Sequence, residues 1–191
     1  MKFGLLLALG IFWLGGCESA PQASRAGPDV LVFDGPNHRV NPFEDQRAKA
    51  IVFFFLRTDC PISNRYAPEI ERLAEKYSSN GIHFWLVYPE PESSFEEIER
   101  HRKEYRLSLE PLRDPRHVLV KMASVTVTPE AAVFLPDGRE LYHGRIDDRY
   151  VDLGKERPEA ITHDLDEALK SVASGKPIVS SVTRAVGCYI E

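Results

Sequence analysis

The 191-residue chain contains only three cysteines, and no two of them form a Cys-x-x-Cys pair. This number is too small for a miniprotein held together by disulfides, and the missing pair argues against a zinc knuckle and an ordinary dithiol motif. The chain also has no basic block: 24 Lys and Arg residues stand against 29 Asp and Glu residues, for a formal charge of −5. A general nucleic-acid-binding protein is therefore not expected. With 43% hydrophobic and 28% charged residues, the composition suits one globular domain.

The first 16 residues have the pattern of a bacterial secretion signal. One charge, Lys2, precedes an apolar run over residues 3–14, and two glycines come just before Cys17. The run is too short to cross a bilayer comfortably as a helix, and residues 14–17 resemble a lipobox, the cleavage and lipidation signature of bacterial lipoproteins. We therefore expect residues 1–16 to be a signal peptide and Cys17 to be the acylated first residue of the mature chain. An uncleaved anchor helix is the alternative, and both place the domain outside the cytoplasm.

Residues 17–29 are expected to form a lipidated tether. They are small, polar and contain proline, which is typical of a flexible linker. The chain is acidic, so the lipid and not electrostatic attraction would hold the protein on an anionic membrane surface. The folded domain is expected to start after this tether.

The first half of the domain shows the hydrophobic periodicity of alternating strands and helices. One continuous apolar run, rich in β-branched and aromatic residues, is typical of a strand buried on both faces. Pro61 and then apolar residues at helical spacing predict an amphipathic helix, and Ser94 with Glu97 predicts a capping box. The expected elements are a strand over residues 50–56, a helix over 61–77, a strand over 82–88 and a helix that ends near 106.

The second half predicts a hairpin and a covering helix. Asp114 and Pro115 suit the start of a short helix, a Pro-Asp-Gly turn at 136–138 predicts a hairpin, and Arg157 with Pro158 is the expected start of the last helix. The expected elements are a short helix over 116–123, strands over 131–135 and 139–143, and a helix with Ile161 on its apolar face that is closed by Gly175. The order of elements predicts an α/β fold, a three-layer α/β/α sandwich with a mixed central sheet over residues 30–175. Residues 176–191 remain as a tail.

Cys60 lies where a predicted strand ends and a predicted helix begins. Functional groups of an open parallel sheet collect at this edge. A cysteine there faces unpaired backbone N–H groups and the positive end of the helix dipole, and both favour the thiolate. The approach through Arg57, Thr58 and Asp59 is polar. Cys60 is therefore the candidate nucleophile, and an inert cysteine that fills a gap in the core is the alternative.

Two segments resemble those of a known family. Residues 55–63 read Phe-Leu-Arg-Thr-Asp-Cys-Pro-Ile-Ser, and residues 127–138 begin with Val-Thr-Pro and end with Leu-Pro-Asp-Gly. They resemble the active-site segment and the cis-proline loop of thioredoxin-like redoxins. That group includes alkyl hydroperoxide reductase/thiol-specific antioxidant domains and membrane-tethered thiol-disulfide oxidoreductases. The resemblance implies a thioredoxin-like fold with Thr58, Asp59, Pro61, Ser63 and Thr128 next to the site. It also implies a cis bond before Pro129, which shapes a groove where a partner's extended segment pairs.

The predicted hairpin brings a charged segment back to the proline loop. If residues pair across the turn with numbers that sum to about 274, Pro129 faces Arg145. Arg145 is then expected to stabilise the thiolate, and Asp147 or Asp148 to transfer protons. A solvated charged loop is the alternative.

The chain departs from the dithiol redoxins at Ser63, which occupies the position of the usual resolving cysteine. Exchange within the motif is therefore impossible. Cys188 is the remaining thiol, in a tail that has no strong helical pattern and is able to run back over the domain. Two thiols in an oxidising compartment tend to pair where geometry allows. Either Cys188 resolves a mixed disulfide or a sulfenic acid on Cys60, or the two form a permanent clamp that contributes about 2–4 kcal/mol.

Peroxidase activity and metal binding compete with disulfide exchange as functions of these thiols. A peroxiredoxin has a threonine three residues before its peroxidatic cysteine, whereas this chain has Arg57 there and its threonine at Thr58. Thiolates select soft metals such as copper, yet none of the six histidines stands at ligand spacing from Cys60 or Cys188. We expect no metal and no cofactor.

The sequence thus predicts a lipid-anchored thiol-disulfide oxidoreductase of the bacterial cell envelope, in which Cys60 attacks and Cys188 resolves. The expected partners are protein or small-molecule thiols and disulfides, with peroxides as an alternative, and the membrane through the lipid. A redox-inactive binding module with a structural disulfide is the competing interpretation.

Overall fold

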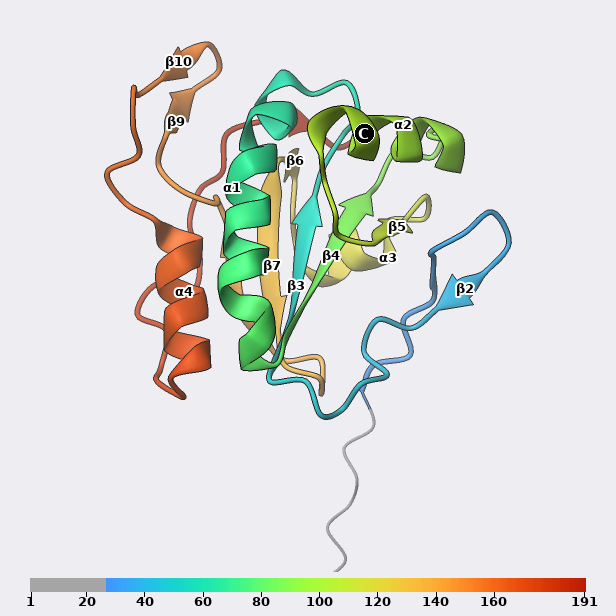
Figure 1. Cartoon of the computed structure of the whole chain (residues 1–191), viewed down its shortest axis with the longest axis horizontal. Coiled ribbons are helices and arrows are strands. Elements are labelled where there is room, and N and C mark those ends of the chain that lie inside the picture. Colours follow the sequence, from blue (N-terminus) through green and yellow to red (C-terminus); the bar gives the residue numbers. More distant parts are fainter. Residues whose placement is uncertain (1–26) are drawn as a thin grey trace, which may run out of the picture.

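The structure consists of a central mixed sheet with helices on both faces (Figure 1). The computed structural model describes residues 27–191. Its strands are β1 (Val32–Phe33), β2 (Arg39–Val40), β3 (Ala50–Phe55), β4 (Ile82–Tyr88), β5 (Pro111–Arg113), β6 (Val127–Thr128), β7 (Glu130–Phe134), β8 (Glu140–Gly144), β9 (Tyr150–Asp152), β10 (Lys155–Glu156) and β11 (Cys188–Tyr189). Its helices are α1 (Pro61–Tyr77), α2 (Phe95–Tyr105), α3 (Val118–Met122) and α4 (Asp164–Ala173), with a 3-10 turn at Ser78–Asn80.

The main sheet has seven strands in the order β2-β1-β5-β4-β3-β7-β8. The pairs β3–β4 and β4–β5 are parallel, and the other pairs are antiparallel. Helices α1, α2 and α4 pack against one face, and α3 packs against the other with the segment before β3. This is the three-layer α/β/α arrangement with a mixed sheet that the sequence predicts.

β3 is the centre of the sheet and is buried on both faces, as its apolar run predicts. All six of its side chains are buried. Alternate residues face opposite layers, so that Phe54 packs in the cluster under α1 while Phe53 and Phe55 pack in the cluster that includes α3. β3 therefore holds the chain firmly up to the edge of the sheet where Cys60 lies.

α1 starts directly after Cys60. Pro61 stands in its first turn, where its fixed φ suits the helix and a missing N–H costs no hydrogen bond. The apolar positions at helical spacing, Ile62, Tyr66, Ile70 and Leu73 among them, are buried against the sheet as predicted. The strand, the turn and the helix together fix the position of one cysteine.

The capping box predicted for the second helix is also present. The Ser94 Oγ accepts a hydrogen bond from the Glu97 N–H at 3.2 Å, and the Ser94 N–H donates to the Glu97 carboxylate at 2.8 Å. α2 then runs to Tyr105, with Arg106 as its C-cap, which agrees with the expected end near residue 106.

The last helix begins later than predicted. α4 starts at Asp164 and not at residue 158, and Ile161 is 74% exposed instead of lying on a buried face. The Asp148 carboxylate accepts hydrogen bonds from the Ile161 and Thr162 N–H groups at 2.6 and 2.9 Å. These bonds hold the preceding residues in a loop, because an N–H that points to Asp148 is not available to a helix. A small hairpin, β9–β10, precedes this loop and was not expected.

The short helix α3 is also trimmed, from the expected 116–123 to Val118–Met122. The buried Asp114 carboxylate accepts hydrogen bonds from the N–H groups of Val118, Leu119 and Val120 at 2.7–3.1 Å. The N-cap residue is His117 and not Asp114, so the predicted cap lies three residues too early, although its carboxylate does bind the first N–H groups of the helix.

Within residues 27–191, no helix is both long and apolar enough to cross a membrane. The predicted signal peptide, Cys17 and most of the predicted tether lie outside the described residues.

Candidate functional site

Cys60 occupies the N-cap of α1 and is fully buried, with 0% of its surface exposed. Its Sγ donates to the Thr128 carbonyl oxygen at 3.2 Å. The N-terminus of α1 places unpaired backbone N–H groups and the positive end of the helix dipole beside the sulfur, and both stabilise a thiolate. The junction of strand and helix thus puts Cys60 where the sequence predicts a nucleophile.

The proline loop lies directly against Cys60. The Thr128–Pro129 peptide bond is cis, as the family resemblance implied. Thr128 is completely buried at the end of β6, and β7 follows at once and pairs with β3. The two segments that carry the family resemblance therefore meet at one point of the fold.

The edge of this loop is already paired, and this corrects an expectation. Instead of leaving a groove for a partner's extended segment, the molecule fills it with its own tail: β11 pairs antiparallel with β6, with Cys188 opposite Thr128 and Tyr189 opposite Val127. The Ile190 N–H extends the pairing to the Thr126 carbonyl oxygen at 3.1 Å. The tail returns over the domain as its sequence permitted, and its return delivers the second cysteine.

Two glycines make this close approach of the tail feasible. A Cβ on Gly187 would lie 2.1 Å from the Thr128 carbonyl oxygen, and a Cβ on Gly144 would lie 2.3 Å from the Thr183 carbonyl oxygen. Both distances are shorter than any normal contact, so only a residue without a side chain fits at either place. This role of Gly187 was not predicted from the sequence, and its position immediately before Cys188 is the signal that was available.

The two thiols are in contact. The Cys188 Sγ donates to the Cys60 Sγ at 2.6 Å, and a disulfide bond measures roughly 2.05 Å. Burial favours the neutral form of Cys60, but hydrogen bonding from Cys188 and from the Ser63 N–H outweighs it, so the pKa of Cys60 is lowered. Burial and the neighbouring Cys60 raise the pKa of Cys188 to about 12. When the pair loses its first proton, the charge therefore resides on Cys60, whose sulfur otherwise donates to Thr128 as a neutral thiol.

Ser63 contributes to this thiolate environment. Ser63 is 1% exposed, and its hydroxyl has no hydrogen-bond partner among the described residues. The residue at the usual resolving position thus supports the first sulfur through its N–H.

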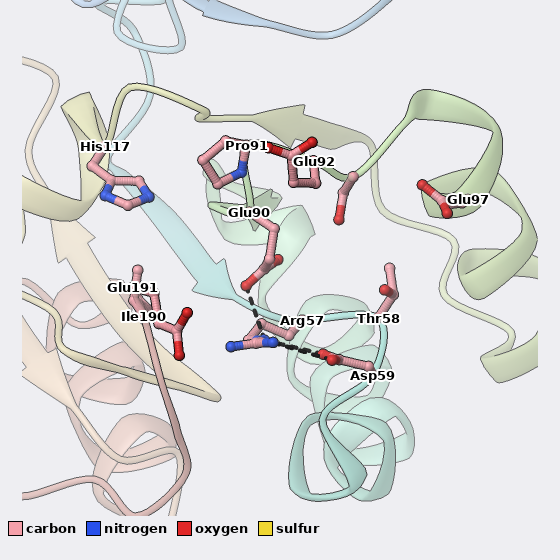
Figure 2. Close-up of a pocket in the computed structure, with 11 residues that line it drawn as sticks. Arg57, Thr58, Asp59, Glu90, Pro91, Glu92, Glu97, His117, Ile190 and Glu191 are labelled. Carbon is pink, nitrogen blue, oxygen red and sulfur yellow. Dashed lines mark hydrogen bonds and ion pairs between the residues drawn. The ribbon is translucent and has the colours of Figure 1, made fainter.

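Arg57, Asp59 and Glu90 form a charged wall next to the tail that carries Cys188 (Figure 2). The Arg57 Nε is 3.0 Å from the Asp59 carboxylate and 3.1 Å from the Glu90 carboxylate. Another nitrogen of Arg57 donates to the Tyr189 carbonyl oxygen at 3.0 Å. Arg57 therefore binds the tail at the residue after Cys188, which explains why an arginine suits the position where a peroxiredoxin has threonine. Thr58 and Asp59 line a pocket beside this wall together with Glu90.

Glu90 is an acidic residue of this wall that was not predicted from the sequence. Burial raises its pKa to about 7 despite the nearby Arg57. Its second carboxylate oxygen is buried, without a hydrogen-bond partner in the described part of the chain. Glu90 follows the end of β4 by two residues, and β4 is the parallel neighbour of β3. The carboxyl ends of parallel strands meet at one edge, so its position was a usable signal.

The structure does not bring Arg145 to the thiols. A bulge between Val133 and Phe134 shifts the hairpin register by one residue. The residue numbers of paired positions beyond the bulge therefore sum to 275 and not to the expected 274. The Arg145 guanidinium instead binds the Asp164 carboxylate at the start of α4, at 2.7 and 3.1 Å. The expectation that Arg145 stabilises the thiolate finds no contact among residues 27–191 to support it.

The two candidate proton carriers are also engaged elsewhere. Asp147 accepts hydrogen bonds from the Tyr66 hydroxyl and from the Arg149 N–H. Asp148 caps the loop before α4. Both are buried and structural in these contacts.

A site with both cysteines and a histidine is not assembled in the described part of the chain. The one cluster there with ligand atoms close enough for a metal ion joins Glu69, Asp147 and His163, within 4.8 Å of one another. It contains neither cysteine.

Comparison with known proteins agrees with this geometry. The model of the AhpC/TSA family matches residues 26–140. The structure is similar to a hypothetical protein of Sinorhizobium meliloti (TM-score 0.72, 22% identity, 86% of this chain and 91% of that chain). It is also similar to an uncharacterized conserved protein of Geobacillus kaustophilus (TM-score 0.72, 24% identity, 87% and 89%). A third similar structure is a putative thiol:disulfide interchange protein DsbE from Chlorobium tepidum (TM-score 0.55, 16% identity, 78% and 94%).

The sequence matches no curated protein. The structural similarities, at these identities, concern the fold, which is the thioredoxin-like sandwich that the motifs implied. The family match covers more than half of the chain and includes the Cys60 motif and the cis-proline loop. This protein therefore belongs to the AhpC/TSA family.

Proposed function

We propose that the protein is an extracytoplasmic thiol-disulfide oxidoreductase whose redox pair is Cys60 and Cys188. The observation that carries the proposal is the contact of the two sulfurs at 2.6 Å, between a residue at a helix N-terminus and a residue 128 positions later. Ser63 removes the usual partner from the motif, and the tail supplies another. The similar protein named as a putative thiol:disulfide interchange protein supports the same chemistry.

The pair exchanges two electrons with a partner. In the dithiol form, loss of two electrons and two protons joins Cys60 and Cys188, and a partner disulfide that accepts them becomes two thiols. In the reverse direction a partner dithiol is oxidised while the internal bond is reduced. Cys60 holds the thiolate, so it is the sulfur of the pair that attacks when the internal bond closes.

Disulfide exchange is favoured over the peroxidase alternative. A peroxide has to reach the peroxidatic sulfur, and Cys60 is fully buried beneath β11. The residue three positions before Cys60 is Arg57, which is occupied with Asp59, Glu90 and the tail. The proposal therefore assigns thiols and disulfides as substrates.

The location is part of the proposal. A lipoprotein signal over residues 1–16, lipidation of Cys17 and a tether over 17–29 would place the domain on the outer side of a membrane. Such a compartment keeps disulfides, whereas the cytoplasm reduces them. Metabolic labelling with a fatty acid, compared between the native chain and its Cys17→Ser variant, tests the anchor. Label in both forms, or in neither, would contradict it.

The function is tested with the mature chain carrying Cys17→Ser, so that only the two pair thiols remain. After oxidation it is mixed with a reduced, unfolded protein, and the disulfides formed in that protein are counted by mass spectrometry. We expect one partner disulfide for each internal bond consumed, and none with Cys60→Ser or Cys188→Ser. A fully oxidised chain that transfers nothing would favour the structural clamp, and turnover that requires peroxide would favour the peroxidase.

A further inference from the structure

The two sulfurs of the pair differ in their access to solvent. Cys60 has no exposed surface, whereas Cys188 is partly exposed. Cys188 lines a groove of about 360 Å³ together with the start of α1 and the β9–β10 hairpin. Apolar side chains line much of this groove, including Ile62, Tyr150 and Leu153, and the Arg65–Glu156 ion pair borders it at 3.0 Å. Cys60 is not among the lining residues.

The strand β11, which covers Cys60, is held by three sets of contacts. β11 pairs with β6, the Ile190 N–H binds the Thr126 carbonyl oxygen, and Arg57 binds the Tyr189 carbonyl oxygen. Cys60 itself belongs to the buried cluster that includes Ile62 and Ala67 of α1. A partner cannot touch Cys60 unless this strand leaves, whereas Cys188 is open to the groove while the strand stays.

We propose that the partner exchanges with Cys188 and not with Cys60, which inverts the order that the sequence predicted. This inference rests on the proposed function. Starting from the oxidised pair, a partner thiolate attacks the Cys188 Sγ. A bond forms between the partner sulfur and Cys188, the Cys60–Cys188 bond breaks, and its electron pair remains on Cys60 as a thiolate. A second thiolate of the partner then attacks the partner's first sulfur and expels Cys188, which takes a proton from water.

The surroundings of the two sulfurs fit these roles. The departing sulfur is the one at the N-terminus of α1, where the helix dipole and the Ser63 N–H stabilise its negative charge. A better stabilised thiolate leaves faster in disulfide exchange. The attacked sulfur lies on a two-residue strand at the surface. The net result is one disulfide in the partner and a dithiol in this protein, so the partner class is a reduced protein or peptide with two thiols.

The test maps the first bond formed. The oxidised mature chain with Cys17→Ser is mixed with glutathione, quenched with acid within a single turnover, and digested for peptide mass spectrometry. We expect glutathione on the Cys188 peptide in at least tenfold excess over the Cys60 peptide, with Cys60 recovered as a free thiol. A majority of glutathione on Cys60 would overturn this proposal and leave the proposed function intact. No adduct on either cysteine, together with an intact internal bond, would contradict both.

A second variant checks that the tail causes the preference. Gly187→Ala places a Cβ against the Thr128 carbonyl oxygen and so forces the tail away from Cys60. In this variant the ratio of glutathione on Cys188 to glutathione on Cys60 is expected to fall at least threefold, because Cys60 becomes accessible. An unchanged ratio would show that the cover formed by β11 does not select the sulfur.

Discussion

The two halves of the redox pair are built in opposite ways. Cys60 stands between a central strand with six buried residues and a helix of 17 residues. Cys188 stands on a strand of two residues, in a tail where Val179 is fully exposed and Tyr189 is 71% exposed. Segments with few buried apolar contacts open more readily than core elements. One sulfur is thus held by the fold, while the other is delivered by a strand that is held mainly by its contacts with the proline loop and Arg57.

The largest effect on disulfide transfer is expected when the Cys60 sulfur, which the fold holds in place, is removed. Cys60→Ser leaves Cys188 without an internal partner, so disulfide transfer to a reduced protein should fall at least about 100-fold, to background. A matched control is the chain with Cys188→Ser and Ser63→Cys, in which a second fixed thiol faces Cys60. Recovery of an internal bond is expected there, because Ser63 is buried beside Cys60, while turnover should stay low because neither sulfur reaches the surface. Full activity of the Cys60→Ser chain would disprove the pair.

The next effect comes from displacing the tail. The Gly187→Ala side chain would lie 2.1 Å from the Thr128 carbonyl oxygen, and overpacking of this kind costs about 1–3 kcal/mol. The rate of internal disulfide formation after addition of oxidant, followed by mass, should fall about 5- to 100-fold. Gly35→Ala is the control, because its Cβ would meet only His38 at an ordinary 3.5 Å. Equal rates in the two variants would argue against a tightly docked tail.

Glu90 is expected to make the stability of the protein depend on pH. Its pKa is about 7 in the folded protein and 4.5 in a free side chain, because burial disfavours the charge. The folded state therefore keeps a proton that the unfolded state loses, and stability should decrease as pH rises from 4.5 to 7. Glu90→Gln should remove this slope and stabilise the protein by about 1–3 kcal/mol at pH 8, with little change at pH 4. Urea unfolding at both pH values measures it, and an unchanged slope would refute the assignment.

The smallest effect is expected at Arg145. Its ion pair with Asp164 is partly exposed, so Arg145→Gln should cost about 1 kcal/mol or less in urea unfolding. Because the guanidinium faces α4 and not the thiols, the reduction potential of the pair should stay within about 10 mV of the native value. A shift above about 30 mV would restore the role that the sequence suggested for this residue.

The sequence predicted the elements whose signals are local. The apolar run of β3, the Pro61 start of α1 and the Ser94–Glu97 capping box are all present, and so is the cis bond before Pro129 that the family resemblance implied. The errors arose where contacts with residues distant in the sequence determine the local structure. Asp148 holds the residues before α4 out of a helix, and a bulge in the β7–β8 hairpin shifts the register that placed Arg145. Neither a side-chain cap 13 residues away nor a bulge is visible in periodicity.

The site was predictable to the same extent. Cys60 and its motif follow from the junction of strand and helix, whereas the contact with Cys188 depends on a tail that meets the proline loop 60 residues earlier in the chain. Its two strand residues carry no helical or strand pattern of their own. The burial of Glu90 likewise depends on tertiary structure, because the loop after β4 packs against Arg57.

A redox titration decides whether Cys60 and Cys188 form a reducible pair. The mature chain with Cys17→Ser is equilibrated in graded thiol-disulfide buffers, alkylated and weighed. We expect a single two-electron transition with an internal bond between Cys60 and Cys188 and a potential above about −300 mV. A bond that stays oxidised below that potential would mean a structural clamp, and the absence of a bond at every potential would mean that Cys188 is not the partner of Cys60.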